Sequence, residues 1–382
     1  MIIKEVRARI IKNSRGEDAI EVTVNKKYTT SAPAGASTGT HEVVAFPVKG
    51  IRFSVAFLNK YPNFSGLRLE EFADLGVFDV LIPVIGGNAV IALQLACLKA
   101  MSGNSIYSFL HPKAKKLPIP LGNCVGGGAH TKRFSTDIQE FLLVPSAKMF
   151  RERMLLNQFA YDLIGKLTGA TNKTDEGAFV LKKSDEEVLD FLQDILFHIE
   201  DTGLGLRMGV DVAASQFYKN RFYHYKNFSS LQKKKMFSPK EQIVLVNRWI
   251  KKYDLAYVED GLHEEDFEGF ARLNKRTLVC GDDLLTTNME RLKIAVRKCS
   301  VNSMIVKPNQ IGSLVQTKAV VDFAGKHDIA TVISHRSGET MDTSIAHLAV
   351  AWNIPYIKTG IHGKERVAKL QELVRIEDEI SS

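Results

Sequence analysis

The sequence contains no long uninterrupted apolar run and no CxxC pair. Its most apolar stretch, residues 77–101, is broken by Asp79 and Pro83, whereas a transmembrane helix needs about 20 consecutive apolar residues. The first residues interleave charged with apolar side chains, unlike a secretory signal peptide. We therefore expect no membrane span and a cytoplasmic location. The four cysteines should then be reduced, mostly buried thiols; they are Cys97, Cys124, Cys280 and Cys299.

The sequence also lacks an extended basic region. Its 51 Lys and Arg residues exceed its 43 Asp and Glu residues, which gives a formal net charge of +8. The lysines are scattered, and the one dense run is Lys233-Lys234-Lys235 in a polar segment before a helix start. We interpret this run as a solvated turn and expect no nucleic acid as partner. The positive balance would help to attract a small anionic substrate.

The length of 382 residues predicts two domains or one domain with an added module. Residues 1–116 are expected to form an α+β domain, with strand-like segments at residues 2–11 and 19–26 joined by a turn. A helix that is apolar nearly all round should run from Asn88, which can act as its N-cap, to Met101. Such a helix is expected to be buried.

Residues 117–382 show a different sequence pattern. Short apolar runs end at a polar residue, and each is followed by a helix-like stretch. From Glu259 onward these polar residues recur at intervals of 23 to 28, about the length of one strand, one helix and two loops. Repeated units of this length predict a parallel sheet closed into a (β/α) barrel. The polar residues should then share one rim of the barrel; they are Asp211, Glu259, Asp282, Lys307, His335 and Lys358.

The types of these residues indicate a chemistry. Asp211, Glu259 and Asp282 would repel one another unless a cation lay between them, and an all-oxygen ligand set favours a hard ion such as Mg2+. A lysine such as Lys307 or Lys358 can remove a proton from the carbon beside a carboxylate once nearby cations lower its pKa. Metal ions and a second lysine can neutralise the resulting negative charge.

Glu140 and Glu176 lie before the metal candidates in the chain. Two carboxyl groups placed together can share a proton, and one of them can then act as general acid on a leaving hydroxyl. Spacing alone favours the simpler interpretation of two surface carboxylates.

Short motifs are spread over nearly the whole chain. The most specific are Gly281-Asp-Asp-Leu284, Lys307-Pro-Asn-Gln-Ile-Gly312, Ser334-His-Arg-Ser-Gly-Glu-Thr340 and Ile357-Lys-Thr-Gly360. The others are Ser14-Arg-Gly16, Gly35-Ala-Ser-Thr-Gly39 with His41-Glu42, Gln139-Glu140-Phe141, Ala170-Thr-Asn172 with Asp175-Glu-Gly177, and Asp211-Val-Ala-Ala-Ser215. Together these motifs resemble the enolase family. The resemblance implies an enolase-type (β/α) barrel with an N-terminal α+β capping domain.

The resemblance also implies roles for the candidates. Lys307 would be the base that takes the proton from carbon 2, and Lys358 would contact the substrate carboxylate. Glu176 would protonate the departing hydroxyl, with Glu140 as its partner. This reverses the interpretation that spacing alone favours for the two glutamates.

The same resemblance implies a ligand set. The first Mg2+ would be held by Asp211, Glu259 and Asp282, and Ser37, on a mobile loop, would join a second Mg2+. Phosphate and closed-site contacts would come from further residues; they are Arg336 and Ser337 for phosphate, and His130 and His335 as lining of the closed site.

The implied activity is that of a phosphopyruvate hydratase, a hydro-lyase. It dehydrates 2-phosphoglycerate reversibly to phosphoenolpyruvate, in glycolysis and gluconeogenesis, with two Mg2+ ions per site. The resemblance further implies a homodimer or an assembly of dimers.

The chain departs from the family pattern beside these motifs. Ala178 replaces a glycine, Gln216 a glutamate and Gly261 a proline, and Pro308 follows Lys307 where a small apolar residue is usual. Because such neighbours set the geometry of a site, the catalytic rate is open. A non-catalytic binding protein would show salt-sensitive binding to RNA or an acidic partner without turnover. An enzyme for a different carboxylate would turn over a non-phosphorylated acid.

Overall fold

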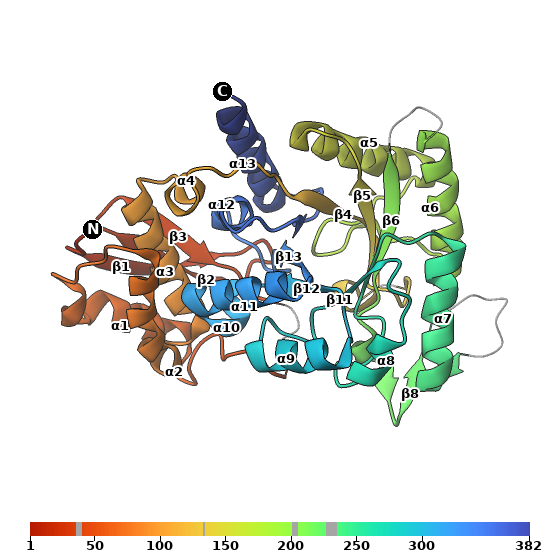
Figure 1. The fold of residues 1–382 in the computed structure, drawn as a ribbon, viewed down its shortest axis with the longest axis horizontal. Helices are drawn as coiled ribbons and strands as arrows, with labels where there is room; N and C mark the ends of the chain where they lie inside the picture. The colour runs from red at the N-terminus through yellow and green to blue at the C-terminus, as the bar shows by residue number, and fades with distance from the viewer. Residues whose placement is uncertain (36–39, 133, 201–204, 227–234) are drawn as a thin grey trace.

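The computed structural model comprises a small sheet-and-helix part at the amino terminus and a closed barrel (Figure 1). Ser37, Lys233 and Lys234, for which the sequence supports predictions, lie outside the described residues. The structure describes residues 1–35, 40–132, 134–200, 205–226 and 235–382.

A three-stranded antiparallel sheet forms one layer of the amino-terminal part. β1 (Val6–Lys12) pairs with β2 (Asp18–Val24), which pairs with β3 (Tyr28–Ala32). The sheet packs against α1 (Gly50–Lys60) and α3 (Gly87–Ser102). Both predicted strands are thus confirmed, although the first begins later than predicted. The shorter helices here are η1 (Pro62–Phe64), η2 (Phe72–Leu81), α2 (Ile82–Ile85) and α4 (Ile106–Leu110).

Helix α3 is buried over most of its length, as its apolar sequence predicts. The prediction that Asn88 is its N-cap is wrong. Asn88 lies inside the helix, and its side chain donates to the carbonyl of Pro33 (3.1 Å) and accepts from Asn309 (3.0 Å). The helix follows Gly86, whose φ is +84° and where a Cβ would lie 2.4 Å from the carbonyl oxygen of Ala45. The backbone at Ala45 comes so close that only glycine fits at the position just before this helix.

Eight strands close into a barrel in the order β10-β11-β12-β13-β14-β4-β5-β6. The six predicted polar residues each end a strand or directly follow one, which confirms the spacing argument. The strands are β4 (Ile119–Gly126), β5 (Glu140–Pro145), β6 (Leu206–Asp211), β10 (Tyr257–Glu259), β11 (Leu278–Gly281), β12 (Ser303–Val306), β13 (Ala330–Ser334) and β14 (Tyr356–Lys358).

The strand β5 runs opposite to both of its neighbours, which differs from the all-parallel sheet that the spacing predicts. A reversed strand brings its first residue, and not its last, to the rim where the other strands end. Glu140 opens β5 and pairs in register with Gly126 of β4 and Asp211 of β6. The reversal therefore places a carboxylate at the rim that strand-end spacing cannot reveal.

Helices surround the barrel on its outside (Figure 1). They are α5 (Phe150–Thr168), α6 (Asp185–Glu200), α7 (Pro239–Lys252), α8 (Phe267–Ala271), α9 (Met289–Lys298), α10 (Pro308–Ile311), α11 (Leu314–Lys326), α12 (Ser344–Ala351) and α13 (Lys364–Ser381). The remaining elements are η3 (Gly128–His130), η4 (Ala214–Phe217) and a small sheet of β7 (Tyr218–Lys219), β8 (Phe222–His224) and β9 (Met236–Phe237).

The barrel interior is filled by its own apolar cluster, with one residue from each of six strands. This cluster consists of Leu121, Leu142, Tyr257, Cys280, Ile305 and Val332. Three of the four cysteines are buried and Cys299 is exposed, in line with the expectation of mostly buried thiols. Within the described part of the chain, no helix is both long and apolar enough to span a membrane. The domain boundary after residue 116 falls between α4 and β4 and stays a prediction.

Candidate active site

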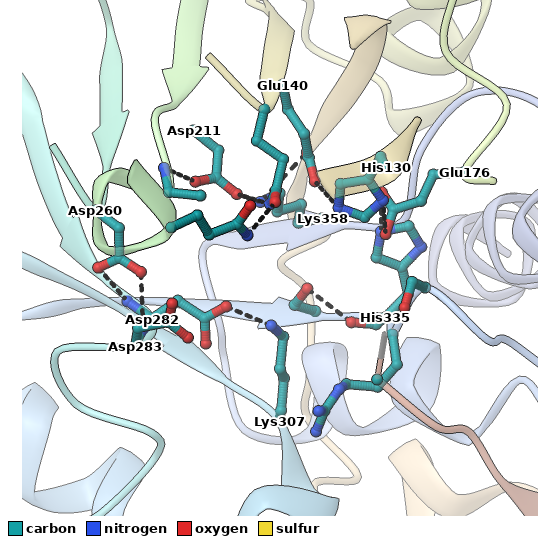
Figure 2. A pocket seen from close by; sticks show the side chains of 17 residues that line it. His130, Glu140, Glu176, Asp211, Asp260, Asp282, Asp283, Lys307, His335 and Lys358 are labelled. Atoms are coloured by element: carbon teal, nitrogen blue, oxygen red, sulfur yellow. Dashed lines mark hydrogen bonds and ion pairs between the residues drawn. The ribbon is translucent and has the colours of Figure 1, made fainter. Parts of the chain in front are cut away.

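A polar pocket opens at the rim where the predicted strand-end residues gather (Figure 2). Glu259 stands beside this pocket and is fully buried, and Ser37 lies outside the described residues. The other predicted site residues line the pocket; they are His130, Glu140, Glu176, Asp211, Asp282, Lys307, His335, Arg336, Ser337 and Lys358. The structure thus brings together residues from the reversed strand, from loops and from strand ends.

Lys358 is the centre of one charge cluster. Its Nζ donates to Oδ2 of Asp211 and to Oε2 of Glu259, each at 2.8 Å, and lies 3.3 Å from Oε2 of Glu140. Burial alone would lower the pKa of Lys358, but the three carboxylates raise it well above its usual range. Lys358 is thus surrounded by three acidic side chains that favour its charged form.

Lys307 forms a second cluster with Asp282, to which its Nζ donates a hydrogen bond. The other oxygen of Asp282, Oδ1, accepts from the side-chain amide of Gln310 at 3.1 Å. Burial would lower the pKa of Lys307, but Asp282 raises it; burial would raise the pKa of Asp282, but Lys307 lowers it. The pair is therefore ionised on both sides.

The glutamates at the opposite wall are buried and not surface carboxylates, so the interpretation from spacing alone is wrong for both. His335 Nε2 lies 3.4 Å from Glu176, and His130 Nε2 lies 3.9 Å from Glu140. Burial raises the pKa of Glu140 well above its usual range against the opposing effect of Lys358. Burial would also raise the pKa of Glu176, but His130 and His335 hold it well below its usual range.

His130 lies between these carboxyl groups. Its Nδ1 is 2.6 Å from Asp175 and 3.7 Å from Glu176. Burial would lower the pKa of His130, but Glu176, Asp175 and Glu140 raise it to about 9. The pKa of Glu140 is thus raised and that of Glu176 lowered, so a proton shared between them favours Glu140.

Arg336 is buried at the edge of the pocket next to the amino-terminal part. Its two terminal nitrogens donate to both oxygens of Glu42, at 3.0 Å and 3.3 Å, and Nη1 also donates to Oδ1 of Asn309 at 3.1 Å. The carbonyl of the neighbouring Ser337 accepts from the buried guanidinium of Arg366 at 3.0 Å. Glu42 belongs to the motif His41-Glu42, but nothing in the sequence predicts it as the partner of Arg336.

Several acidic side chains could hold a cation. The predicted trio is divided, because Asp211 and Glu259 contact Lys358 while Asp282 contacts Lys307. Groups with ligand atoms within 4.8 Å of one another are, among the described residues, Asp260-Asp282-Asp283 and His130-Glu140-Glu176. The first group is partly structural, since the carboxylate of Asp260 accepts the backbone N–H groups of Asp282 and Asp283.

The predicted trio fits a hard divalent cation on two observations. All of its donors are carboxylate oxygens. The Oε1 atom of Glu259 is fully buried and has no hydrogen-bond partner among the residues that the structure describes. Burial and the neighbouring Asp211 raise the pKa of Glu259 to about 8 against the opposing effect of Lys358. A cation beside Glu259 would favour its ionised form.

Four positions at which the sequence departs from the family pattern have identifiable local surroundings in the structure. Pro308 occupies the first turn of α10, where a missing N–H leaves no helix bond unmade. The side-chain amide of Gln216 donates to Gln139 at 2.7 Å, and the carbonyl of Gly261 accepts from Gln242 at 3.1 Å. The N–H of Ala178 donates to the hydroxyl of Thr174. Three of the four positions thus take part in local hydrogen bonds, and Pro308 needs none at its place in the helix.

A closed barrel with lysines, carboxylates and a buried arginine gathered at one rim is the arrangement of a (β/α)-barrel enzyme. The model of the family described as "Enolase, C-terminal TIM barrel domain" matches residues 114–382. The chain is 39% identical to the enolase of Methanothermobacter thermautotrophicus, over 99% of this chain and 97% of the relative. It is 38% identical to the enolase of Archaeoglobus fulgidus, over 99% and 98% of the two chains. The chain belongs to the enolase family.

Proposed function

We propose that this protein is a phosphopyruvate hydratase, which removes water reversibly from 2-phosphoglycerate to give phosphoenolpyruvate. The observation that carries the proposal is the single pocket in which Lys307 and Lys358 face Glu176 and His335, with Arg336 at its edge. Such a pocket offers amines, carboxyl groups and an anion-binding guanidinium to one small substrate. Family membership supports the same reaction.

Arg336 and Ser337 bind the substrate phosphate. A guanidinium suits this task because it can donate two parallel hydrogen bonds to phosphate oxygens. Arg336 already presents two nitrogens to Glu42, so its fork is oriented before substrate arrives. Lys358, fixed among three carboxylates, contacts the substrate carboxylate.

Lys307 removes the proton from carbon 2. A base must be neutral, and Asp282 keeps the pKa of Lys307 raised while the two side chains are paired. Without that carboxylate, burial together with the charges of Arg336 and Lys358 lowers the pKa of Lys307. Lys307 can therefore act as the base when Asp282 contacts another partner and no longer pairs with the amine.

Glu176 delivers a proton to the hydroxyl that leaves from carbon 3, and Glu140 is its partner. The C2–H electron pair becomes the new C2–C3 double bond as the C3–O bond breaks and water departs. The raised pKa values of Glu140 and His130 favour protons on both groups, and His130 lies 3.7 Å from Glu176, so Glu176 can draw on a nearby proton. His335 lies on the other side of Glu176 and lines the closed site.

Asp211, Glu259 and Asp282 hold a first Mg2+, and Ser37, outside the described residues, joins a second. Bound Mg2+ would neutralise the negative charge that develops on the substrate carboxylate when the proton leaves. The all-carboxylate donor set supports this assignment, as does the buried Oε1 of Glu259, which has no hydrogen-bond partner among the described residues. Cytoplasmic glycolysis and gluconeogenesis, and a homodimer or an assembly of dimers, follow from the family resemblance.

The proposal is tested by following phosphoenolpyruvate formation by ultraviolet absorbance. Purified protein is given 2-phosphoglycerate with Mg2+, with a chelator, or with glycerate in place of the phosphorylated acid. We expect Mg2+-dependent product from 2-phosphoglycerate only. A folded, Mg2+-binding protein that makes no phosphoenolpyruvate would refute the proposal, and turnover of glycerate would favour a different carboxylate as substrate.

A further inference from the structure

Two successive threonines, Thr286 and Thr287, adopt left-handed backbone conformations between β11 and α9. Their φ angles are +47° and +54°, and their exposed fractions are 1% and 0%. A β-branched residue rarely has a positive φ, because its side chain crowds the backbone there. Such strain persists where the surrounding structure requires it, and it concentrates at functional sites.

The two hydroxyl groups have different surroundings. The Oγ1 of Thr287 accepts from the backbone N–H of Lys307 at 2.9 Å and donates to Oε1 of Gln310 at 2.6 Å. The Oγ1 of Thr286 is buried and has no hydrogen-bond partner within the described parts of the chain. Only the second threonine of this pair is thus connected to Lys307 by its side chain.

Gln310 links the hydroxyl of Thr287 to acidic side chains of the site. Because its oxygen faces the hydroxyl of Thr287, its amide nitrogen faces carboxylates, and it donates to Asp282 at 3.1 Å and to Glu42 at 3.4 Å. The backbone N–H of Gln310 donates to the carbonyl of Lys307 at 2.9 Å. Gln310 is itself almost fully buried, so its orientation is fixed by these partners.

We propose that Thr287 is a positioning residue for Lys307 and Asp282. Its hydroxyl fixes the backbone at Lys307 and, through Gln310, the carboxylate that pairs with Lys307. In this left-handed conformation the hydroxyl contacts both partners at once. This inference rests on the proposed function, in which Lys307 is the base.

The test compares three variants with the native enzyme. Thr287→Val keeps the shape of the side chain and removes its hydroxyl, Thr287→Ser restores the hydroxyl, and Thr286→Val is the matched control in the same conformation and burial. Because Thr287 is buried behind the pocket, we expect Thr287→Val to lower kcat by about 10- to 100-fold while KM changes less than about threefold. Thr287→Ser and Thr286→Val should stay within about twofold of native.

A second readout does not depend on turnover. Hydrogen exchange at the backbone amide of Lys307 should accelerate in Thr287→Val and stay as in native protein in Thr286→Val and Thr287→Ser. Unchanged kcat and amide protection in Thr287→Val would overturn the inference, as would equal losses in Thr286→Val. If Thr287→Val does not fold, Gln310→Met takes its place, and native kcat in that variant would be the contradicting result.

The two readouts also separate this inference from the proposed function. If the native protein shows no turnover while Thr287→Val still loses protection at the amide of Lys307, the proposed function fails and the hydroxyl contact stands. If the native protein is active and Thr287→Val is indistinguishable from it in both readouts, the proposed function stands and the positioning role of Thr287 fails.

Discussion

Lys307 donates a hydrogen bond from Nζ to Oδ2 of Asp282, so the proposed base and a proposed metal ligand neutralise each other. The same relationship recurs at Lys358, which pairs with Asp211 and Glu259. Both amines of the pocket therefore contact the carboxylates proposed to hold Mg2+. A cation that engages these carboxylates changes the partners of both lysines, which links metal binding to the state of the base.

The first prediction identifies the cation ligands. Glu259→Gln should abolish the rise in thermal stability that Mg2+ produces, because it removes a buried carboxylate whose Oε1 lacks a partner among the described residues. Native protein should gain about 2.7 kcal/mol at an Mg2+ concentration of 100 times Kd. Asp283→Asn is the matched control and should keep the gain. The reverse pattern would assign the ion to the group of Asp260, Asp282 and Asp283.

The second prediction concerns Glu42, which pairs with Arg336 in a buried contact. Glu42→Gln should lower the free energy of unfolding by about 1–3 kcal/mol, because the charge of Arg336 loses its partner while one hydrogen bond can remain. Inorganic phosphate should then stabilise the variant more than the native protein, as measured by thermal unfolding. Glu265→Gln, which alters a half-exposed contact of Arg291, should leave the phosphate effect unchanged. Equal phosphate effects in native protein and Glu42→Gln would contradict the assignment of Arg336.

The third prediction concerns the loop that carries Glu176. The hydroxyl of Tyr161 on α5 donates to the carbonyl of Gly177 at 2.6 Å. Tyr161→Phe should cost about 1 kcal/mol of stability and lower kcat several-fold, because the backbone beside Glu176 loses an anchor. Tyr253→Phe, which removes a hydroxyl bonded to Asp190, should affect stability alone. A native kcat in Tyr161→Phe would show that this anchor is dispensable.

The fourth prediction concerns Asp185, which lies outside the pocket. Its Oδ1 accepts the N–H groups of Asp137 and Ile138, and burial, with Asp137 adding to it, raises the pKa of Asp185 to about 8. The folded state thus keeps a proton that the unfolded chain releases near pH 4. The contribution of Asp185 to stability is therefore fully present below about pH 4 and is lost as pH rises through about 8.

Asp185→Asn tests this sign, because the amide imitates the protonated acid at every pH. In urea unfolding between pH 5 and pH 8, the free energy of unfolding of the variant should rise relative to that of native protein by up to about 1.4 kcal/mol per pH unit. Glu268→Gln, at an exposed site, should follow the native profile. Parallel profiles for Asp185→Asn and native protein would contradict the raised pKa.

Strand-end spacing was sufficient to predict the barrel and six residues of its rim, because a repeated unit leaves a period in the sequence. This spacing does not predict Glu140, because β5 runs in the opposite direction and Glu140 is its first residue and not its last. The contact between Glu42 and Arg336 joins positions 294 residues apart, and no local pattern encodes it. Spacing and residue type indicated a metal site and a lysine base, whereas the individual role proposed for each residue came from the resemblance to the family motifs.

Two kinds of feature could not be predicted from the sequence at all. The left-handed conformation of Thr287 contradicts the backbone preference of threonine, so propensity argues against it. The pairing of each lysine with particular carboxylates depends on side-chain orientation, which the period of the strands does not determine. Such contacts become visible only when the packing of the whole rim is known.

The most direct test of the account is the exchange of the carbon-2 hydrogen of 2-phosphoglycerate with solvent, followed by NMR in D2O with Mg2+. Native protein should exchange this hydrogen and form phosphoenolpyruvate. Lys307→Ala should do neither, whereas Glu176→Gln should retain exchange and lose product, because it keeps the base and removes the acid. Exchange by Lys307→Ala at the native rate would show that another group removes the proton and would contradict the central claim.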